Sequence, residues 1–172
     1  MVAETRKKPF EAVVAAHGAT VLRVTRAILG PNDADDAWSD TFLAAMAAYP
    51  DLPADANVEA WLVTIAHRKA IDIIRAAGRR PLAVGDVPDS ASSTAAGERD
   101  VDLNLDLVAA VAGLPDKQRK SVAYHYLAGL RFAQIAELLG TNEAAARRAA
   151  ADGIARLRRT ASHTLGVPHD LC

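Results

Sequence analysis

The chain has 172 residues, of which 51% are hydrophobic and 24% are charged, so it can fold into one or two small domains and is not a disordered tail. Aromatic residues make up only 5% and alanine supplies much of the hydrophobic class, which favours closely packed helices over a β-sheet and predicts an all-α protein. The formal net charge of −1 excludes a uniformly basic coat for nucleic acid.

Hydrophobic periodicity predicts three helices in the first 80 residues. Apolar side chains recur at steps of three and four over 10–29, then from Asn32 or Asp33 to residue 49, and again over 57–78. The polar residue that opens the second and the third helix can accept hydrogen bonds from free backbone amides. The inward stripe of the second helix is expected to be Trp38, Phe42, Met46 and Tyr49.

Residues 81–104 are rich in Pro, Gly, Ser, Ala and Asp, which is the composition of a flexible linker. This stretch divides the chain into an N-terminal domain over 1–80 and a C-terminal domain over 105–172. The C-terminal domain is expected to start with a brief helix, followed by a second helix that Asp116 caps and Gly129 ends.

A helix-turn-helix is predicted next. The run RFAQIAELLG is a short amphipathic helix, and a longer helix follows from Thr141 or Asn142. Ala136 lies four residues before Gly140, so a small residue stands where the two helices cross and a glycine stands at the turn. Gly153 is expected to loosen the longer helix, because glycine costs about 1 kcal/mol relative to alanine in a helix interior.

Charged residues segregate into alternating acidic and basic blocks. Residues 31–57 carry six aspartates and no lysine or arginine, whereas 68–80 is basic. The linker is acidic again, and the last third of the chain is basic. Solvated helix faces would produce such clusters, and so would separate contacts with different partners.

The residues offer little for catalysis or for binding a cofactor. The five histidines show no HExxH motif, no paired Glu-x-x-His and no partner cysteines, so no metal site is expected. Adjacent carboxylates such as Asp35 and Asp36 point to different sides of a helix and make a poor acid–base pair. We expect no enzyme, no cofactor and no small-molecule substrate.

A reducing, cytoplasmic location is expected. The single cysteine, Cys172, cannot form an internal disulfide, and the first nine residues lack the apolar core of an export signal. No apolar run approaches the roughly 18 residues that a membrane span needs, so no membrane insertion is expected.

Two basic surfaces suit two different contacts with nucleic acid. The longer helix after the turn has polar and basic residues in its first turns and can enter a major groove, although a solvated helix would carry the same charges. The third helix combines cations with a preceding polar loop, which suits separated strands whose bases leave the stack. Trp61, at the start of that helix, is expected to pack in the core.

Three runs, in this order, resemble conserved segments of bacterial sigma-70 family sigma factors: DADDAWSDTFLAAMAAY, NVEAWLVTIAHRKAIDIIR and LPDKQRKSVAYHYLAGLRFAQIAELLG. The resemblance covers almost the whole chain outside the linker and the ends. The short two-domain layout is similar to the extracytoplasmic-function group. The resemblance implies that the first domain binds core RNA polymerase and the melted minus-ten promoter element. It implies that the second domain binds the minus-thirty-five duplex. It also implies that an anti-sigma factor masks the free protein.

The family pattern also implies which residues make these contacts. Expected polymerase-binding residues are Asp35, Asp36, Ser39 and Asp40, with Phe42 packing beneath. Expected minus-ten contacts are Asp55, Asn57, His67, Arg68, Lys69, Arg75 and Arg79. Expected minus-thirty-five contacts are Arg131, Gln134, Thr141, Asn142, Glu143, Arg147 and Arg148.

The chain departs from the family pattern at a few positions. Ser39 stands where glutamine is usual, and Ala149 and Asp152 replace usual cations of the recognition helix. Two other functions stay open at this point. One is a stand-alone helix-turn-helix regulator, which would bind a palindrome as a dimer. The other is a helical adaptor that keeps the polymerase-binding face but has lost promoter reading.

Overall fold

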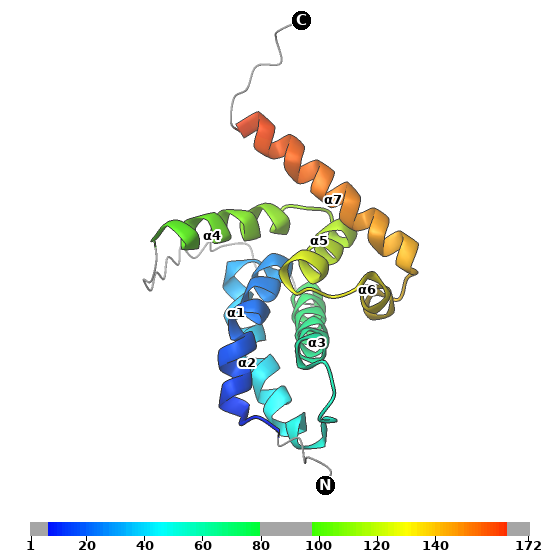
Figure 1. The fold of residues 1–172 in the computed structure, drawn as a ribbon. Helices are drawn as coiled ribbons and strands as arrows, with labels where there is room; N and C mark the ends of the chain where they lie inside the picture. Colours follow the sequence, from blue (N-terminus) through cyan, green and yellow to red (C-terminus); the bar gives the residue numbers. More distant parts are fainter. Residues whose placement is uncertain (1–6, 80–97, 165–172) are drawn as a thin grey trace, which may run out of the picture.

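The structure is a computed structural model that describes residues 7–79 and 98–164 (Figure 1). Every regular element in these two stretches is helical, which confirms the all-α prediction. The first six residues, residues 80–97 with most of the expected linker, and the tail from 165 to Cys172 lie outside the described residues.

Three long helices form the N-terminal half, which here means residues 7–79. Helix α1 spans Phe10–Leu29, α2 spans Pro31–Ala48 and α3 spans Val58–Arg79, with the short 3-10 helix η1 at Tyr49–Asp51. These positions agree with the three helices predicted from periodicity.

The start of α2 differs from the prediction, whereas the start of α3 agrees with it. The N-cap of α2 is Gly30, at φ 80°, and not Asn32 or Asp33. Pro31 follows as the first helical residue, where its missing N–H costs no helical hydrogen bond and its φ is already helical. At the start of α3, the side-chain oxygen of Asn57 accepts a backbone N–H of the first turn at 3.0 Å.

The C-terminal half, residues 98–164, also consists of helices. They are α4 (Glu98–Ala112), α5 (Asp116–Val122), the π-helical turn η2 (Ala123–Leu127), α6 (Phe132–Leu139) and α7 (Glu143–Thr164).

Two details of this half correct the sequence-based expectations. Helix α4 begins at Glu98, so residues 98–104 are helical and the expected linker ends earlier than Asn104. Asp116 is the first residue of α5 and not its cap, and its carboxylate instead contacts Arg119 and Lys120 at 3.1 and 2.8 Å.

Helices α6 and α7 form the predicted helix-turn-helix. Gly140 ends α6 in the left-handed conformation, at φ 62° and ψ 38°, which residues with a Cβ rarely adopt. Thr141 N–H then donates to the carbonyl oxygen of Ala136 at 2.9 Å. The side chain of Asn142 caps α7 by accepting the N–H of Ala145 at 2.8 Å.

Gly153 marks a close approach of α7 to α5. The residue is buried, and a Cβ placed on it would lie 2.7 Å from Cγ2 of Val122. Gly153 therefore has a role beyond its expected cost to the helix, because the missing side chain allows the two helices to pack.

The two halves share a hydrophobic core. Val24 and Ile28 of α1 and Val63 of α3 belong to the same cluster as Tyr124 of η2 and Ile135 of α6, and each of these residues is at most 4% exposed. Figure 1 shows α4 and α5 lying over the upper ends of α1 and α3. A second cluster belongs to the N-terminal half alone. The structure therefore packs the two expected domains against each other.

Helix α1 corrects the expectation that no segment is long and apolar enough for a membrane span. Its 20 residues reach that threshold by length and composition, with a mean hydropathy of 1.3. In the structure, Val13, Val21, Val24 and Ala27 are buried against neighbouring helices. The apolar residues of α1 thus serve as a core face of the helical bundle.

Candidate polymerase and nucleic-acid interfaces

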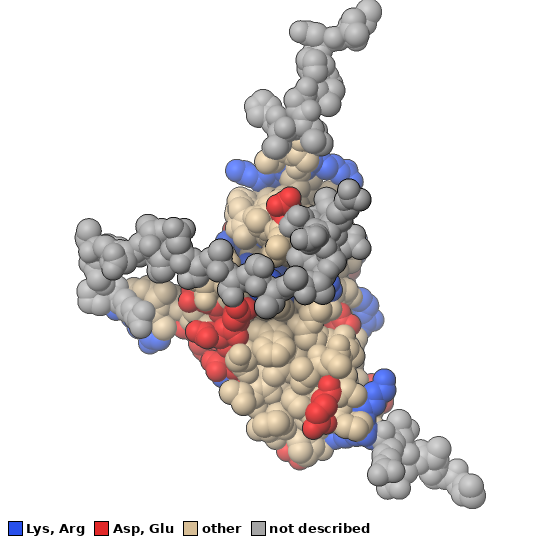
Figure 2. Space-filling model, turned by 90° about the vertical axis from the view of Figure 1, so that its left-hand side faces the viewer, with Lys and Arg blue, Asp and Glu red and all other residues tan. Residues whose placement is uncertain are grey.

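The acidic residues of α2 form an exposed face. Asp36, Ser39 and Asp40 are all exposed and, being three and four residues apart, share one side of the helix. Asp35 lies toward α1, where its Oδ1 is 3.5 Å from Nη2 of Arg26. Figure 2 shows carboxylates gathered on the N-terminal half beside uncharged surface.

Two large apolar residues continue this acidic face along α2. Leu43 is 61% exposed and Met46 is 54% exposed, although an amphipathic helix of this kind normally buries such side chains. Met46 was expected in the inward stripe, and that expectation is wrong. Phe42 does pack inward as expected, with its ring centroid 4.7 Å from that of Trp38. We call the surface formed by Asp36, Ser39, Asp40, Leu43 and Met46 the α2 face.

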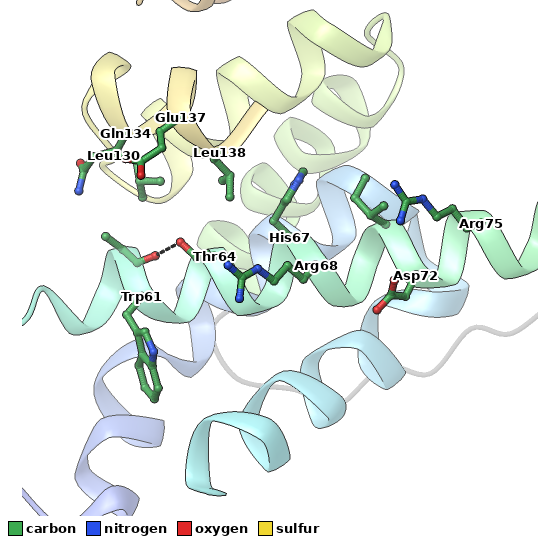
Figure 3. A pocket seen from close by; sticks show the side chains of 12 residues that line it. Trp61, Thr64, His67, Arg68, Asp72, Arg75, Leu130, Gln134, Glu137 and Leu138 are labelled. Carbon is green, nitrogen blue, oxygen red and sulfur yellow. Dashed lines mark hydrogen bonds between the residues drawn. The ribbon is translucent and has the colours of Figure 1, made fainter. Parts of the chain in front are cut away.

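A cleft of about 630 Å³ separates α3 from α6 and brings together residues expected at two different promoter elements. Figure 3 shows His67, Arg68 and Arg75 on the α3 side, with Gln134 and Leu138 on the other wall. Trp61 packs against the N-terminal core and also lines the cleft, so its expected core role is only part of its environment. The other expected minus-ten residues lie away from the cleft lining: Asp55, Asn57, Lys69 and Arg79.

His67 contacts the C-terminal half directly. Its Nδ1 lies 2.6 Å from the hydroxyl oxygen of Tyr124, which is fully buried. Burial, with Lys120 nearby, lowers the pKa of His67 to about 4. Burial raises the pKa of Tyr124, so its hydroxyl keeps its proton. At neutral pH the pair is therefore uncharged, and His67 supplies no cation to a DNA backbone.

This environment predicts how His67 titrates. An unfolded His67 takes up a proton near pH 6.5, whereas the folded one does so only near pH 4. The unfolded state therefore binds more protons between these values, and the free energy of unfolding falls as pH drops from 6.5 toward 4. A difference of one full proton gives about 1.4 kcal/mol per pH unit, and the slope is smaller wherever the two states differ by less than one proton. An NMR titration should give a pKa near 4, and a midpoint near 6.5 would contradict burial between the halves.

The expected contact residues of the helix-turn-helix are mostly exposed, but some of their side chains already make contacts within the protein. The side chains of Thr141, Asn142, Glu143, Arg147, Arg148 and Arg131 are exposed. The side chain of Gln134 is already used, because its Oε1 accepts the backbone N–H of Arg131 at 3.0 Å at the start of α6. Arg147 donates to Glu143 at 2.5 Å, and its guanidinium lies over the ring of Phe132, 5.5 Å from the centroid.

Comparisons with known proteins match both halves of the chain. Residues 13–80 match sigma-70 region 2, and residues 104–157 match sigma-70 region 4. The ECF RNA polymerase sigma factor SigK of Mycolicibacterium vanbaalenii is 31% identical over 170 residues, which cover 92% of this chain and 86% of that protein. The chain belongs to the sigma-70 family. Its relatives place this sigma factor in the extracytoplasmic-function (ECF) group, as the sequence resemblance implied.

Other relatives of this ECF sigma factor agree in sequence and in fold. SigC of Mycobacterium tuberculosis is 28% identical over 134 residues, covering 77% of this chain and 72% of that protein. The structure of CnrH, solved with the cytosolic domain of CnrY, is 25% identical with a TM-score of 0.62 and covers 90% of this chain and 88% of that one. RpoE of Bartonella quintana, solved with the anti-sigma factor NepR, shares the fold at 19% identity and a TM-score of 0.66, covering 87% and 94%.

Membership of this family confirms several expectations. Sigma factors are DNA-binding transcription initiation factors that act with RNA polymerase, and they are not enzymes. Sequence reasoning proposed the α2 carboxylates and the basic residues of α3 and α7 as contact residues, and these contacts stay predictions. It missed Leu43 and Met46 on the α2 face, because their exposure depends on which way the helix faces. It also missed Tyr124 as the partner of His67 and Phe132 as the partner of Arg147, because these contacts join residues that are distant in sequence.

Proposed function

We propose that this ECF sigma factor docks on core RNA polymerase through the α2 face and directs the enzyme to promoters that it reads at two elements. The observation that carries the proposal is the exposed pair Leu43 and Met46 directly beside Asp36, Ser39 and Asp40. Apolar side chains flanked by carboxylates suit a protein surface that combines an apolar patch with cations.

Minus-ten reading is proposed for α3. Arg68 and Arg75 are exposed and line the cleft toward α6, so a separated strand that follows them would enter between the two helices. Asp55 and Asn57 lie in the loop before α3, where polar side chains can meet unstacked bases. Lys69 and Arg79 add positive charge elsewhere on α3, whereas the neutral His67 adds none.

Minus-thirty-five reading is proposed for the start of α7. Thr141, Asn142, Arg147 and Arg148 are exposed at the N-terminal end of this helix, which is the end that enters a major groove in helix-turn-helix proteins. Asp152 is exposed further along the same helix and would repel phosphate. Binding should weaken with salt, by about 0.9 log units per log unit of salt for each phosphate contact.

The family resemblance also supports an anti-sigma partner and a cytoplasmic location. RpoE of Bartonella quintana was solved with an anti-sigma factor, and CnrH was solved with the cytosolic domain of CnrY. We propose that a protein inhibitor of this kind masks the free factor, and that the factor acts in the cytoplasm, where RNA polymerase transcribes.

Charge reversal on the α2 face tests polymerase docking. We expect Asp36→Lys with Asp40→Lys to weaken binding to core RNA polymerase at least about tenfold, equivalent to 1.4 kcal/mol, and to abolish run-off transcription. Glu11→Lys with Asp51→Lys makes the same charge change at exposed positions outside the α2 face and is the matched control. Binding is measured by fluorescence titration of labelled sigma factor with core enzyme.

The outcomes separate the alternative functions. Equal affinity of the two double variants for core enzyme would contradict docking through the α2 face. Tight palindrome binding by the chain alone, without transcription from any promoter, would support a stand-alone regulator. Polymerase binding without promoter-specific run-off product would support an adaptor.

A further inference from the structure

The π-helical turn η2 directs two neighbouring aromatic side chains to different helices. Tyr124 reaches His67 of α3 and is fully buried. His125 instead faces Phe132 at the start of α6, where the two rings stack with centroids 4.1 Å apart and an interplanar angle of 22°. Extra residues in π-helical turns are often associated with functional sites, and here the turn places His125 against Phe132.

His125 is held in one orientation. Its Nδ1 lies 2.8 Å from the carbonyl oxygen of Leu130, and because a carbonyl only accepts, this nitrogen carries the proton. The ring of Tyr126 meets it edge-on at 4.8 Å. The hydrogen bond and the contact with Tyr126 hold the ring of His125 in place, so His125 in turn restricts the ring of Phe132 that stacks on it.

Phe132 carries the guanidinium of Arg147 on its ring. The Cζ atom of Arg147 lies 5.5 Å from the ring centroid, and Glu143 accepts a hydrogen bond from Nη2 of the same side chain. Arginine otherwise loses much rotamer freedom when it binds, so a side chain that is already oriented retains more of its binding free energy.

We propose that Phe132, supported by His125, is a positioning residue that orients Arg147 for the minus-thirty-five duplex. This inference rests on the proposed reading by α7 and adds a residue that does not itself touch DNA. Glu143 and the aromatic face together fix the guanidinium, while the side chain stays 63% exposed and accessible to a groove. Phe132 also packs against the shared core, so the test must separate positioning from packing.

A double-mutant cycle in the holoenzyme makes this separation. The probe is a duplex selected from a random library by the wild-type holoenzyme, compared with the same duplex carrying a scrambled minus-thirty-five element. Phe132→Leu keeps an apolar side chain but removes the aromatic face, and we expect it to weaken binding about two- to fivefold on the selected duplex only. Arg147→Ala should weaken the same binding about tenfold or more. The double variant should bind no worse than Arg147→Ala.

A conservative variant and a spectroscopic readout complete the design. Phe132→Tyr keeps the ring and should bind like the wild type. In the free protein, the ring-current shift of the Arg147 side-chain NMR signals should be present with phenylalanine or tyrosine and lost with leucine. A purely structural role of Phe132 would lower thermal stability and binding to both duplexes alike.

The outcomes distinguish this proposal from the one on which it rests. Effects of Phe132→Leu and Arg147→Ala that multiply in the double variant would overturn positioning and leave reading by Arg147 intact. An Arg147→Ala variant that binds both duplexes as the wild type does would overturn both. Loss of binding by Phe132→Leu that is equal on the two duplexes would also overturn positioning.

Discussion

Replacing Gly153 with alanine is expected to destabilise the C-terminal half, although alanine is the better helix former by about 1 kcal/mol. The new Cβ would lie 2.7 Å from Cγ2 of Val122, and 3.4 Å from both Cβ of Gln118 and Cδ1 of Leu114. Val122 is 2% exposed and β-branched, so it cannot swing away. Overpacking of this kind costs about 1–3 kcal/mol, which leaves a net loss of up to about 2 kcal/mol.

Gly78 provides the matched control. It lies in α3, is exposed, and has nothing within 4 Å of a Cβ placed on it. Gly78→Ala should therefore leave the free energy of unfolding unchanged or raise it by up to about 1 kcal/mol. Urea unfolding of the full chain, followed by circular dichroism, measures both variants. If Gly153→Ala proved as stable as Gly78→Ala, the close approach of α7 and α5 would be contradicted.

A second substitution tests the cause of the loss. Val122→Ala removes the methyl group that the new Cβ would meet. We expect Val122→Ala to destabilise the wild-type chain, but to cost less in the Gly153→Ala background, because the shortened side chain makes room for the new Cβ, which in turn fills part of the space left. Such coupling between residues in contact is commonly about 0.5–3 kcal/mol.

Local sequence features predicted local structure well. Periodicity located α1, α2 and α3, and the capping residues Asn57 and Asn142 were found because a polar side chain stands before an apolar periodic run. Ala136 and Gly140 marked the turn of the helix-turn-helix, because a small residue is needed where the helices cross and a glycine adopts the left-handed conformation at the turn. These features need no knowledge of distant residues.

The direction of α2 was harder to predict. Counting large apolar residues places Met46 inward, but the helix buries the small side chains Ala34, Ala37, Thr41 and Ala45 against its neighbours. Small residues allow close helix packing yet contribute little to a hydrophobic pattern. The result is that Met46 faces outward and enlarges the α2 face, which sequence reasoning had limited to its polar residues.

The sequence also could not predict which helices pack against the apolar faces. Val24 and Ile28 continue the apolar stripe of α1, and nothing in their spacing tells whether another helix of the N-terminal half or of the C-terminal half covers them.

The early start of α4 was missed because apolar residues alternate with acidic or amide residues from Val101 to Leu107, which is a spacing of two and not of three or four.

The largest loss of stability is expected from replacing Tyr124 with alanine. This side chain is fully buried in the core that the two halves share, and its hydroxyl contacts Nδ1 of His67 at 2.6 Å. Truncating a buried aromatic side chain typically lowers the free energy of unfolding by about 3–5 kcal/mol, through lost apolar burial and the cavity that remains.

Two further variants divide this loss into its causes. Tyr124→Phe keeps the ring and removes only the hydroxyl, so it should cost about 1–3 kcal/mol, because the half-buried His67 loses its partner. Tyr126→Ala changes the same residue type two positions away, where the side chain is 57% exposed and meets only His125 edge-on among the described aromatic rings, and it should cost at most about 1.5 kcal/mol. Both are measured in the full chain by urea unfolding.

The unfolding profile shows whether the halves depend on each other. Because Tyr124 packs in one cluster with residues of α1 and α3, its loss should lower the unfolding midpoint of both halves together. Tryptophan fluorescence reports the N-terminal half, since Trp38 and Trp61 both lie there, and circular dichroism reports all helices. A fluorescence transition that stays at the wild-type midpoint in Tyr124→Ala would contradict a shared core. A matching shift of both transitions would mean that the two walls of the cleft between α3 and α6, where Arg68 and Arg75 lie, belong to one cooperative unit held by the shared core.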